Sequence, residues 1–198
     1  MNDDLSFWLS DVPEIDRNRD EYIVLPSNGM ITPINVVPNE SADYSKLVNG
    51  REINVNQYLK SGVLVYPGTN SLGYGSVGNT VIFGHSSYFK NDTGRYKTHF
   101  QKIIELESGE EIWVYQKQED GSYKRFRYIV TTSYNTPSSD TSVLAAGIGK
   151  NLTLFTCTPI GGISGRWIVQ AKYIDEEKQY LESVLFGANL TKEEKNTV

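Results

Sequence analysis

Short β-type segments divided by tight turns run through most of this chain and constrain its fold more than any other feature. Residues 22–25 and 31–37 are rich in β-branched and apolar side chains, and a Ser-Asn-Gly turn at positions 27–29 separates them. A regular alternation of strands and helices does not follow, so a parallel α/β sheet is not expected. The pattern predicts a mainly β domain that closes fully or partly into a barrel. The other predicted strands cover residues 62–66, 80–83, 111–116, 124–133, 152–156 and 166–173.

Helices are expected to be few and short. Residues 1–20 are polar and acidic and predict a flexible N-terminal lead-in. Residues 176–198 are expected to supply a C-terminal helix and a solvated tail. The predicted organisation is therefore one β-barrel domain over residues 21–175 with an extension at each end. Apolar spacing predicts helices within residues 54–60, 100–106, 141–146 and 175–186.

The composition is that of an ordinary globular protein and argues against some functions. A length of 198 residues suits one domain with one buried core. The net charge of −5 argues against a general nucleic-acid binder, which needs a basic face to replace the counterions on phosphates. No apolar stretch approaches the roughly 20 residues that span a bilayer. The acidic N-terminus also lacks the basic and apolar regions of a signal peptide.

The single cysteine, Cys157, is the first candidate for chemistry. One thiol can form neither an intramolecular disulfide nor a zinc site built from several thiolates. Cys157 follows the apolar segment 152–156 and precedes a glycine-rich loop, so the strand would fix its backbone while the loop leaves space for a substrate. The alternative is a buried, inert thiol, because free cysteine is among the most buried residue types.

Histidine is almost as scarce, with His85 and His99 the two in the chain. His85 follows the apolar segment 80–83 and comes directly after Gly84, which can bend the chain and keep the ring uncrowded. Taken alone, His85 is better interpreted as a structural histidine. His99 lies in a polar stretch and is interpreted as a surface or packing residue.

Arg166 begins the last predicted strand, nine positions after Cys157. The intervening loop is rich in glycine, so the two residues can return to the same end of neighbouring strands. A permanent positive charge there would favour the thiolate or hold an oxyanion through fixed N–H donors. The alternative is an exposed strand arginine paired with a carboxylate. Each candidate is weak evidence alone, and the joint placement of all three is stronger.

These candidates lie in segments that resemble those of the sortase family. Residues 153–159, T-L-F-T-C-T-P, resemble the T-L-x-T-C signature around the sortase cysteine. Residues 79–86, N-T-V-I-F-G-H-S, resemble the N-T-V-x-x-G-H segment, and residues 166–169, R-W-I-V, resemble the strand that begins with arginine. The similarity covers about residues 22–173, with the motifs in the family's order. The two spacer segments that also agree are residues 62–68 and 100–113.

The resemblance implies an eight-stranded sortase-like β-barrel with a few short helices. It also implies a cysteine transpeptidase and endopeptidase (EC 3.4.22 type) that acts on LPXTG-like sorting signals. Cys157 would attack the threonine carbonyl of the signal and form a thioacyl enzyme, in the two steps usual for covalent catalysis. His85 would protonate the leaving amine and later deprotonate the incoming amine. Arg166 would hold substrate or stabilise the oxyanion, and Thr156 is a candidate supporting or oxyanion residue from its place beside the nucleophile.

Partners and location follow from the same resemblance. The expected partners are surface proteins or pilins that carry a sorting signal, and an amine acceptor such as lipid II, a peptidoglycan stem peptide or a pilin lysine. No nucleic acid is expected as a partner. Sortases are tethered to the membrane, so we expect the full-length protein at the extracellular face of the cell membrane, with its anchor absent from this chain. No cofactor is expected: calcium activates some members, but the scattered carboxylates of Glu105, Glu107, Glu110 and Glu111 do not predict a calcium site.

Two details bear on the class of sortase. The short loop between Cys157 and Arg166, and the Thr158-Pro159 pair after the cysteine, resemble class C or class D sortases more than the housekeeping class A type. Pilin-polymerising sortases often carry an N-terminal lid with an Asp-Pro-aromatic motif. Residues 3–8 read D-D-L-S-F-W, without the proline, so the lid motif is incomplete.

Other protein classes make different predictions from the same residues. A cysteine L,D-transpeptidase would have a histidine shortly before the cysteine in an S-H-G-C-type cluster, which this chain lacks. A papain-like peptidase has its cysteine before its histidine, the opposite of the order here. A noncatalytic cell-surface β-domain would keep Cys157 buried and remote from His85 and Arg166. The position of the thiol therefore distinguishes a catalytic from a structural cysteine.

Overall fold

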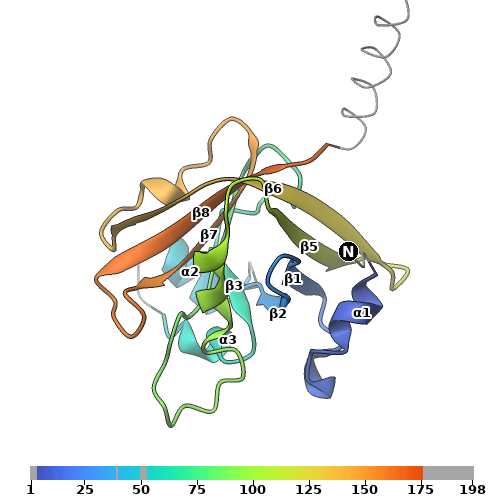
Figure 1. Cartoon of the computed structure of the whole chain (residues 1–198), viewed down its shortest axis with the longest axis horizontal. Coiled ribbons are helices and arrows are strands. Elements are labelled where there is room, and N and C mark those ends of the chain that lie inside the picture. Colours follow the sequence, from blue (N-terminus) through green and yellow to red (C-terminus); the bar gives the residue numbers. More distant parts are fainter. Residues whose placement is uncertain (1–3, 39, 50–52, 176–198) are drawn as a thin grey trace, which may run out of the picture.

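Eight strands form one closed barrel, as predicted (Figure 1). The structure is a computed structural model and describes residues 4–38, 40–49 and 53–175. Around the barrel the strand order is β1-β2-β3-β4-β7-β8-β6-β5. The pairs β2–β3 and β4–β7 are parallel, and the other pairs are antiparallel. The strands are β1 (Glu21–Leu25), β2 (Met30–Asn35), β3 (Val63–Val65), β4 (Gly78–Phe83), β5 (Glu111–Lys117), β6 (Tyr123–Pro137), β7 (Lys150–Thr158) and β8 (Gly165–Tyr173).

Alternation along β7 decides which of its side chains fill the barrel and which face outward. Leu152 and Leu154 are fully buried in the main core cluster, whereas Phe155 and Cys157 are only partly buried. Successive side chains of a strand point to opposite faces, so Cys157 lies on the outer face of the barrel wall. A strand paired on both sides, to β4 and to β8, therefore carries the thiol.

The helical elements are short. Three of the four predicted segments contain a helix, and the fourth, residues 175–186, lies outside the described residues except for its first position. The longest 3-10 segment, η2, packs into the core through Phe100 and Ile103, both fully buried. Besides α1, described below, the elements are η1 (Glu14–Asp16), α2 (Ala42–Val48), α3 (Asn56–Leu59), η2 (His99–Glu105) and η3 (Ser142–Leu144).

The N-terminal segment packs against the barrel, so the expectation of a loose lead-in was wrong for its described residues. Helix α1 (Leu5–Leu9) begins after Asp4, whose side chain accepts a hydrogen bond from the backbone N–H of Ser6. Leu5, Trp8 and Val12 are buried against the outer face of β1, β2 and β5, where Trp8 meets Trp113 edge to face at 6.1 Å. These three apolar side chains, two on α1 and one just beyond it, pack the segment against the barrel.

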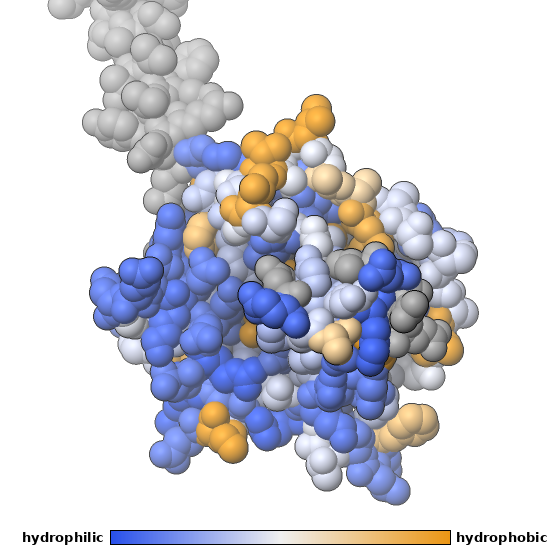
Figure 2. Space-filling model, turned by 180° about the vertical axis from the view of Figure 1, so that it is seen from behind, coloured by the Kyte–Doolittle hydropathy of each residue, from blue (hydrophilic) through white to orange (hydrophobic). Residues whose placement is uncertain are grey.

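The surface outside this packing is mostly hydrophilic. Figure 2 shows a face that is largely blue, with separate hydrophobic groups. Among the described residues, no helix is long and apolar enough to cross a membrane. The exposed large apolar side chains are Phe7, Ile15, Val36, Leu72, Val77, Phe89, Ile129, Ile148, Ile160 and Ile163.

Candidate active site

Cys157 and Arg166 are paired directly across β7 and β8. In an antiparallel pair, opposed side chains leave the same face with their Cβ atoms about 4.5–5.5 Å apart. Both residues line the same surface pocket, of about 390 Å³. The structure therefore brings Cys157 and Arg166 together through the register of the two strands, although nine positions separate them in the sequence.

His85 reaches the same pocket from the strand on the other side of β7. Strands β4 and β7 run parallel, with Phe83 opposite Phe155. The register continues beyond β4, because the backbone N–H of Gly84 donates to the carbonyl of Phe155 at 3.3 Å. One more residue brings His85 level with Cys157, and His85 also lines the pocket. Cys157 on β7 thus lies between Arg166 on β8 and His85, which follows the end of β4 by two residues.

Gly84 serves close packing more than bending. A Cβ atom at this position would lie 2.8 Å from Cβ of Phe100 and 2.8 Å from Cγ1 of Val63. Any other residue would therefore push η2 or β3 away. The glycine lets the chain that carries His85 lie tightly on the barrel.

Thr156 occupies the inner face next to Cys157. Its side chain is 1% exposed, and its hydroxyl donates a hydrogen bond of 2.8 Å to the carbonyl of Gly84. The hydroxyl hydrogen is thus committed to the backbone before His85 and is not available to an oxyanion. The contact fits a supporting position for Thr156 and does not fit the oxyanion alternative.

Arg166 is held by backbone carbonyls and not by a carboxylate. Its Nη1 donates to the carbonyls of Ile163 at 3.0 Å and Gly165 at 2.8 Å. Among the described residues, no acidic side chain forms an ion pair with Arg166. The alternative of a surface arginine in a salt bridge therefore does not describe this residue. Its remaining N–H donors are free to meet a ligand beside Cys157.

His85 is fixed by two residues that the sequence analysis did not single out. Its Nε2 lies 3.0 Å from Oδ1 of Asn56, and its ring stacks on that of Tyr88 with centroids 4.5 Å apart. Burial lowers the pKa of His85 below its usual value, and the charge of Asp92 opposes part of this shift. Tyr88 follows His85 by three positions and could have been noticed as a nearby ring. Asn56 is 29 positions away, and no local pattern links it to His85.

The rest of the pocket is mainly apolar. Phe83 and Phe155 stack face to face, with centroids 5.1 Å apart and planes 4° apart, and Tyr66 packs against Phe83 at 6.0 Å. Asp140 adds a carboxylate to the lining, and its oxygens accept hydrogen bonds from the side chains of Thr136 and Ser142. The other apolar lining residues are Val55, Leu59, Pro67, Val143 and Leu144.

The N-terminal segment does not contribute to this pocket. The lining comes from α3, from the ends of β3, β4, β7 and β8, from the stretch between β6 and η3, and from η3 itself. The described residues of the segment that was compared with a lid, 4–8, lie on the outer face of β1 and β5 instead. In the part of the chain that the structure describes, no group of three or more His, Cys, Asp or Glu side chains could hold a metal ion.

A closed eight-stranded barrel with a cysteine, a histidine and an arginine at one groove defines a class of cysteine enzyme. A family model described as the sortase domain matches residues 37–174, and the chain therefore belongs to the sortase family. The sortase assignment and the eight-stranded barrel predicted from the sequence are both confirmed. In general terms the protein is a sortase transpeptidase.

Solved sortase structures share the fold. Sortase C1 of pilus island 1 of group B Streptococcus is similar with a TM-score of 0.58 and 18% identity over 80% of this chain. A lid mutant of sortase A from Corynebacterium diphtheriae has a TM-score of 0.56 and 23% identity over 78% of this chain. Sortase A from Listeria monocytogenes has a TM-score of 0.58 and 16% identity over 80% of this chain. No curated protein sequence matches the chain significantly.

The length of these relatives differs. The chain covers 65% of the group B Streptococcus sortase C1, 69% of the Corynebacterium sortase A and 88% of the Listeria sortase A. The neighbours include both pilus-related sortase C enzymes and sortase A enzymes. The shared barrel therefore shows the fold and does not select a class of sortase.

Proposed function

We propose that this sortase cleaves an LPXTG-like sorting signal through a thioacyl intermediate on Cys157 and transfers the acyl group to an amine. In this mechanism the Cys157 thiolate attacks the threonine carbonyl, and His85 protonates the amine that leaves. The incoming amine then loses a proton to His85 and displaces the thiolate. Arg166 donates hydrogen bonds to the carbonyl oxygen or to the signal's backbone while charge develops.

The position of Cys157 between His85 and Arg166 carries this proposal. The pairing of β7 with β4 and β8 brings His85, two residues beyond β4, to one side of Cys157 and Arg166 to the other. The thiol is partly exposed and lines a pocket, as a nucleophile requires. A noncatalytic β-domain with a buried structural cysteine would need neither feature.

The aromatic pair beside the site supports a signal with apolar residues before the cleaved bond. Phe83 and Phe155 lie two positions before His85 and Cys157, on the same outer face. An extended peptide with its threonine at the thiol would pass its preceding residues over these ring faces. Flat aromatic surfaces favour proline and aliphatic side chains through apolar burial. Leucine and proline of an LPXTG-like signal have this character.

The acceptor and location are part of the proposal. We expect the substrates to be surface proteins or pilins, and the amine to come from a peptidoglycan precursor or a pilin lysine. The six-residue connection between β7 and β8 resembles that of class C or D sortases more than that of class A, and we expect the protein to belong to class C or D. The protein would act at the extracellular face of the membrane, which protease treatment of intact cells can test.

The decisive experiment incubates the protein with a panel of LPXTG-type peptides and amine acceptors and follows the products by mass spectrometry. The proposal predicts an acyl adduct on Cys157, a cleaved peptide and an acceptor-linked product. Hydroxylamine should release the adduct as a hydroxamate, because it attacks thioesters. Cys157→Ala is the matched control that lacks the thiol and should give none of these species. A folded protein that forms no adduct with any signal in the panel would contradict the proposal.

A further inference from the structure

Asn56, at the start of α3, connects the ring of His85 to a second side chain. Its Oδ1 lies 3.0 Å from Nε2 of His85, and its Nδ2 donates a hydrogen bond of 2.7 Å to the hydroxyl of Tyr88. The ring of Tyr88 in turn stacks on the imidazole at 4.5 Å with the planes 23° apart. His85 is therefore held at one ring edge and on one ring face by two residues that contact each other.

We propose that Asn56 is a positioning residue for His85, holding the ring through its Nε2–H and leaving Nδ1 to exchange protons in the pocket. This inference rests on the catalytic use of His85 proposed above. An amide oxygen can only accept hydrogen bonds, so Nε2 must carry the proton of the neutral imidazole. The opposite nitrogen is then bare and basic, as proton transfer from a thiol or an amine requires.

The same arrangement suits both charge states of the ring. When His85 takes up a proton, both nitrogens donate, and Asn56 Oδ1 still accepts from Nε2–H. The hydrogen bond strengthens as the ring becomes charged, because charge-assisted bonds are the stronger ones. Asn56 thus stabilises the imidazolium that gives its proton to the leaving amine, without adding a full negative charge to the pocket.

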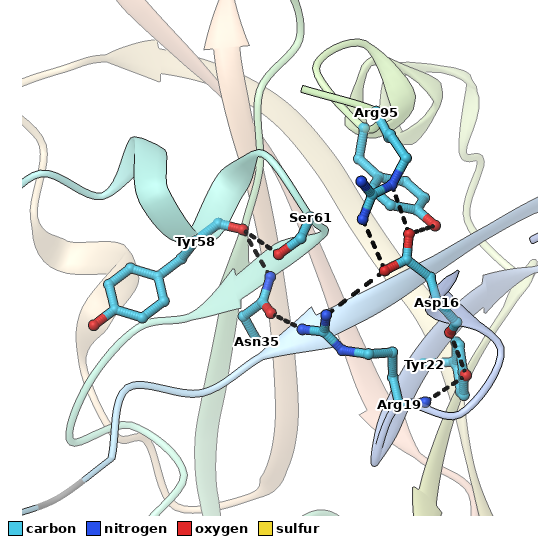
Figure 3. Close-up of polar contacts among 8 residues, drawn as sticks. Asp16, Arg19, Tyr22, Asn35, Tyr58, Ser61 and Arg95 are labelled. Carbon is cyan, nitrogen blue, oxygen red and sulfur yellow. Dashed lines mark hydrogen bonds and ion pairs between the residues drawn. The ribbon is translucent and has the colours of Figure 1, made fainter. Parts of the chain in front are cut away.

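Helix α3 is short, and contacts on two sides keep Asn56 in place. On one side, the side chain of Asn35 donates to the carbonyl of Tyr58 at 2.8 Å, as Figure 3 shows. On the other, the backbone N–H of Arg95 donates to the carbonyl of Lys60 at 3.0 Å. The segment from His85 to Arg95 includes Tyr88. This hydrogen bond joins the segment to the C-terminal end of α3, the helix that begins at Asn56.

The buried carboxylate of Asp16 connects the two contacts that hold α3. Asp16 accepts two hydrogen bonds from Arg95, at 2.7 and 2.9 Å, and lies 3.6 Å from Nη1 of Arg19. Arg19 also donates to Oδ1 of Asn35 (Figure 3). Through Asp16 and Arg19, the N-terminal segment therefore contacts both Asn35 and Arg95, the two residues that bond to the end of α3.

Nuclear magnetic resonance of the ¹⁵N-histidine-labelled full chain tests the tautomer directly. Long-range ¹H–¹⁵N correlations distinguish a protonated ring nitrogen from a bare one, and His99→Gln assigns the two histidines of the chain. In the wild-type protein above pH 7.5, His85 should carry its proton on Nε2. In Asn56→Ala this preference should be lost. A proton on Nδ1 in the wild type, or an unchanged tautomer in Asn56→Ala, would overturn the inference.

Kinetics on the same variants tests the consequence. Asn56→Ala should lower kcat about tenfold with little change in KM, as expected for loss of a hydrogen bond to a group that becomes charged. Gln57→Ala is the matched control on α3, because its side chain contacts Asp43 and not His85. Tyr88→Phe keeps the stacked ring and should lower kcat less than Asn56→Ala. An Asn56→Ala enzyme with wild-type kcat would contradict the proposal.

The pH profile separates positioning from general loss of structure. Asn56→Asp keeps an acceptor but adds a negative charge, so the limb of the profile that reports His85 should move to higher pH. The other charged or titratable groups near this ring are Tyr88, Asp92, Cys157, Arg166 and Asp140, and they are unchanged in the variant. If the wild type shows the Nε2–H tautomer but no transpeptidation, the proposed function fails while the orientation of the ring stands.

Discussion

Cys157 and Arg166 are a directly opposed pair on two antiparallel strands, and this pairing places the arginine's backbone beside that of the cysteine although nine positions separate them in the sequence. The backbone hydrogen bonds of β7 and β8 fix where both side chains leave the barrel. Arg166 is further held by the carbonyls of Ile163 and Gly165. The guanidinium is therefore placed beside the thiol before any substrate arrives, which reduces the cost of organising the site during reaction.

Arg166→Ala should lower kcat/KM by about two to three orders of magnitude, the usual cost of removing one oxyanion donor. Stability should fall by about 1 kcal/mol or less, since the side chain is only partly buried and its hydrogen bonds can be replaced by water. Arg166→Lys keeps the charge but loses the fork of donors, and should recover only part of the activity. Peptide kinetics and urea unfolding on the three proteins measure both effects. Parallel losses of activity and stability would instead make Arg166 a structural residue.

Cys157→Ala should abolish the acyl adduct and leave the fold intact. The thiol is partly exposed on the outer face of the barrel, so its removal leaves no cavity in the core. The far-ultraviolet circular dichroism and the melting temperature should match those of the wild type within a few degrees. Intact-protein mass after incubation with the best signal peptide checks the chemistry. Retained transpeptidation in this variant would exclude Cys157 as the nucleophile.

The barrel could be predicted from the sequence because strand and turn signals are local. The apolar run before Cys157 and the glycine-rich loop after it mark β7 and its end, and β8 begins at Gly165, one residue before the predicted start at Arg166. Contacts between segments that are distant in the sequence have no local pattern from which they could be predicted. Asn56 meets His85 only after the barrel has closed, and its short helix has no pattern that points to a histidine.

The prediction of a flexible N-terminal segment was wrong for its described residues for a related reason. In this acidic segment, nothing distinguishes Asp16 from a surface residue. In the structure Asp16 is 1% exposed and accepts a hydrogen bond from Arg95, 79 positions later. A carboxylate is read as a surface residue unless its partner is known. The same holds for Leu5, Trp8 and Val12, whose spacing is helical but whose partner surface on β1 and β5 exists only in the folded barrel.

Arg95→Ala should destabilise the fold by about 3–5 kcal/mol, because it leaves the buried carboxylate of Asp16 with only Arg19 and the hydroxyl of Tyr96. Urea unfolding measures the change. The matched control is Lys46→Ala, which removes an exposed ion pair with Asp43 and should cost less than about 0.5 kcal/mol. A loss in Arg95→Ala no larger than in the control would show that the N-terminal segment contributes little to stability.

Stability should fall as the pH drops below about 6.5, and His99 should account for part of the loss. Burial lowers the pKa of His99 below its usual value of 6.5, with a nearby backbone hydrogen bond opposing the shift. Between the folded and the unfolded pKa, the unfolded chain binds a proton that the folded protein does not, so folding loses stability as the pH falls. Above the unfolded pKa both states are neutral and this contribution is constant. His99→Gln should therefore show a smaller stability difference between pH 7.5 and pH 5.5, measured by urea unfolding. An unchanged difference would contradict the assignment to His99.

Thr156 offers a way to separate a supporting residue from an oxyanion donor. Its hydroxyl donates to the carbonyl of Gly84, directly before His85, and its side chain is buried. Thr156→Val keeps the shape but leaves that carbonyl without this donor, which should cost about 1–2 kcal/mol of stability. Since the backbone before His85 loses its support, kcat should fall about tenfold.

A hydroxyl that stabilised the oxyanion would instead cost about a hundredfold or more in kcat. Thr156→Ser retains the hydroxyl and removes one buried methyl group, so it should lose stability by about 1 kcal/mol and keep kcat. If kcat falls from the wild type through Thr156→Ser to Thr156→Val by no more than about tenfold in all, Thr156 acts by supporting the carbonyl of Gly84. If kcat of Thr156→Val falls about a hundredfold or more, the hydroxyl acts as an oxyanion donor.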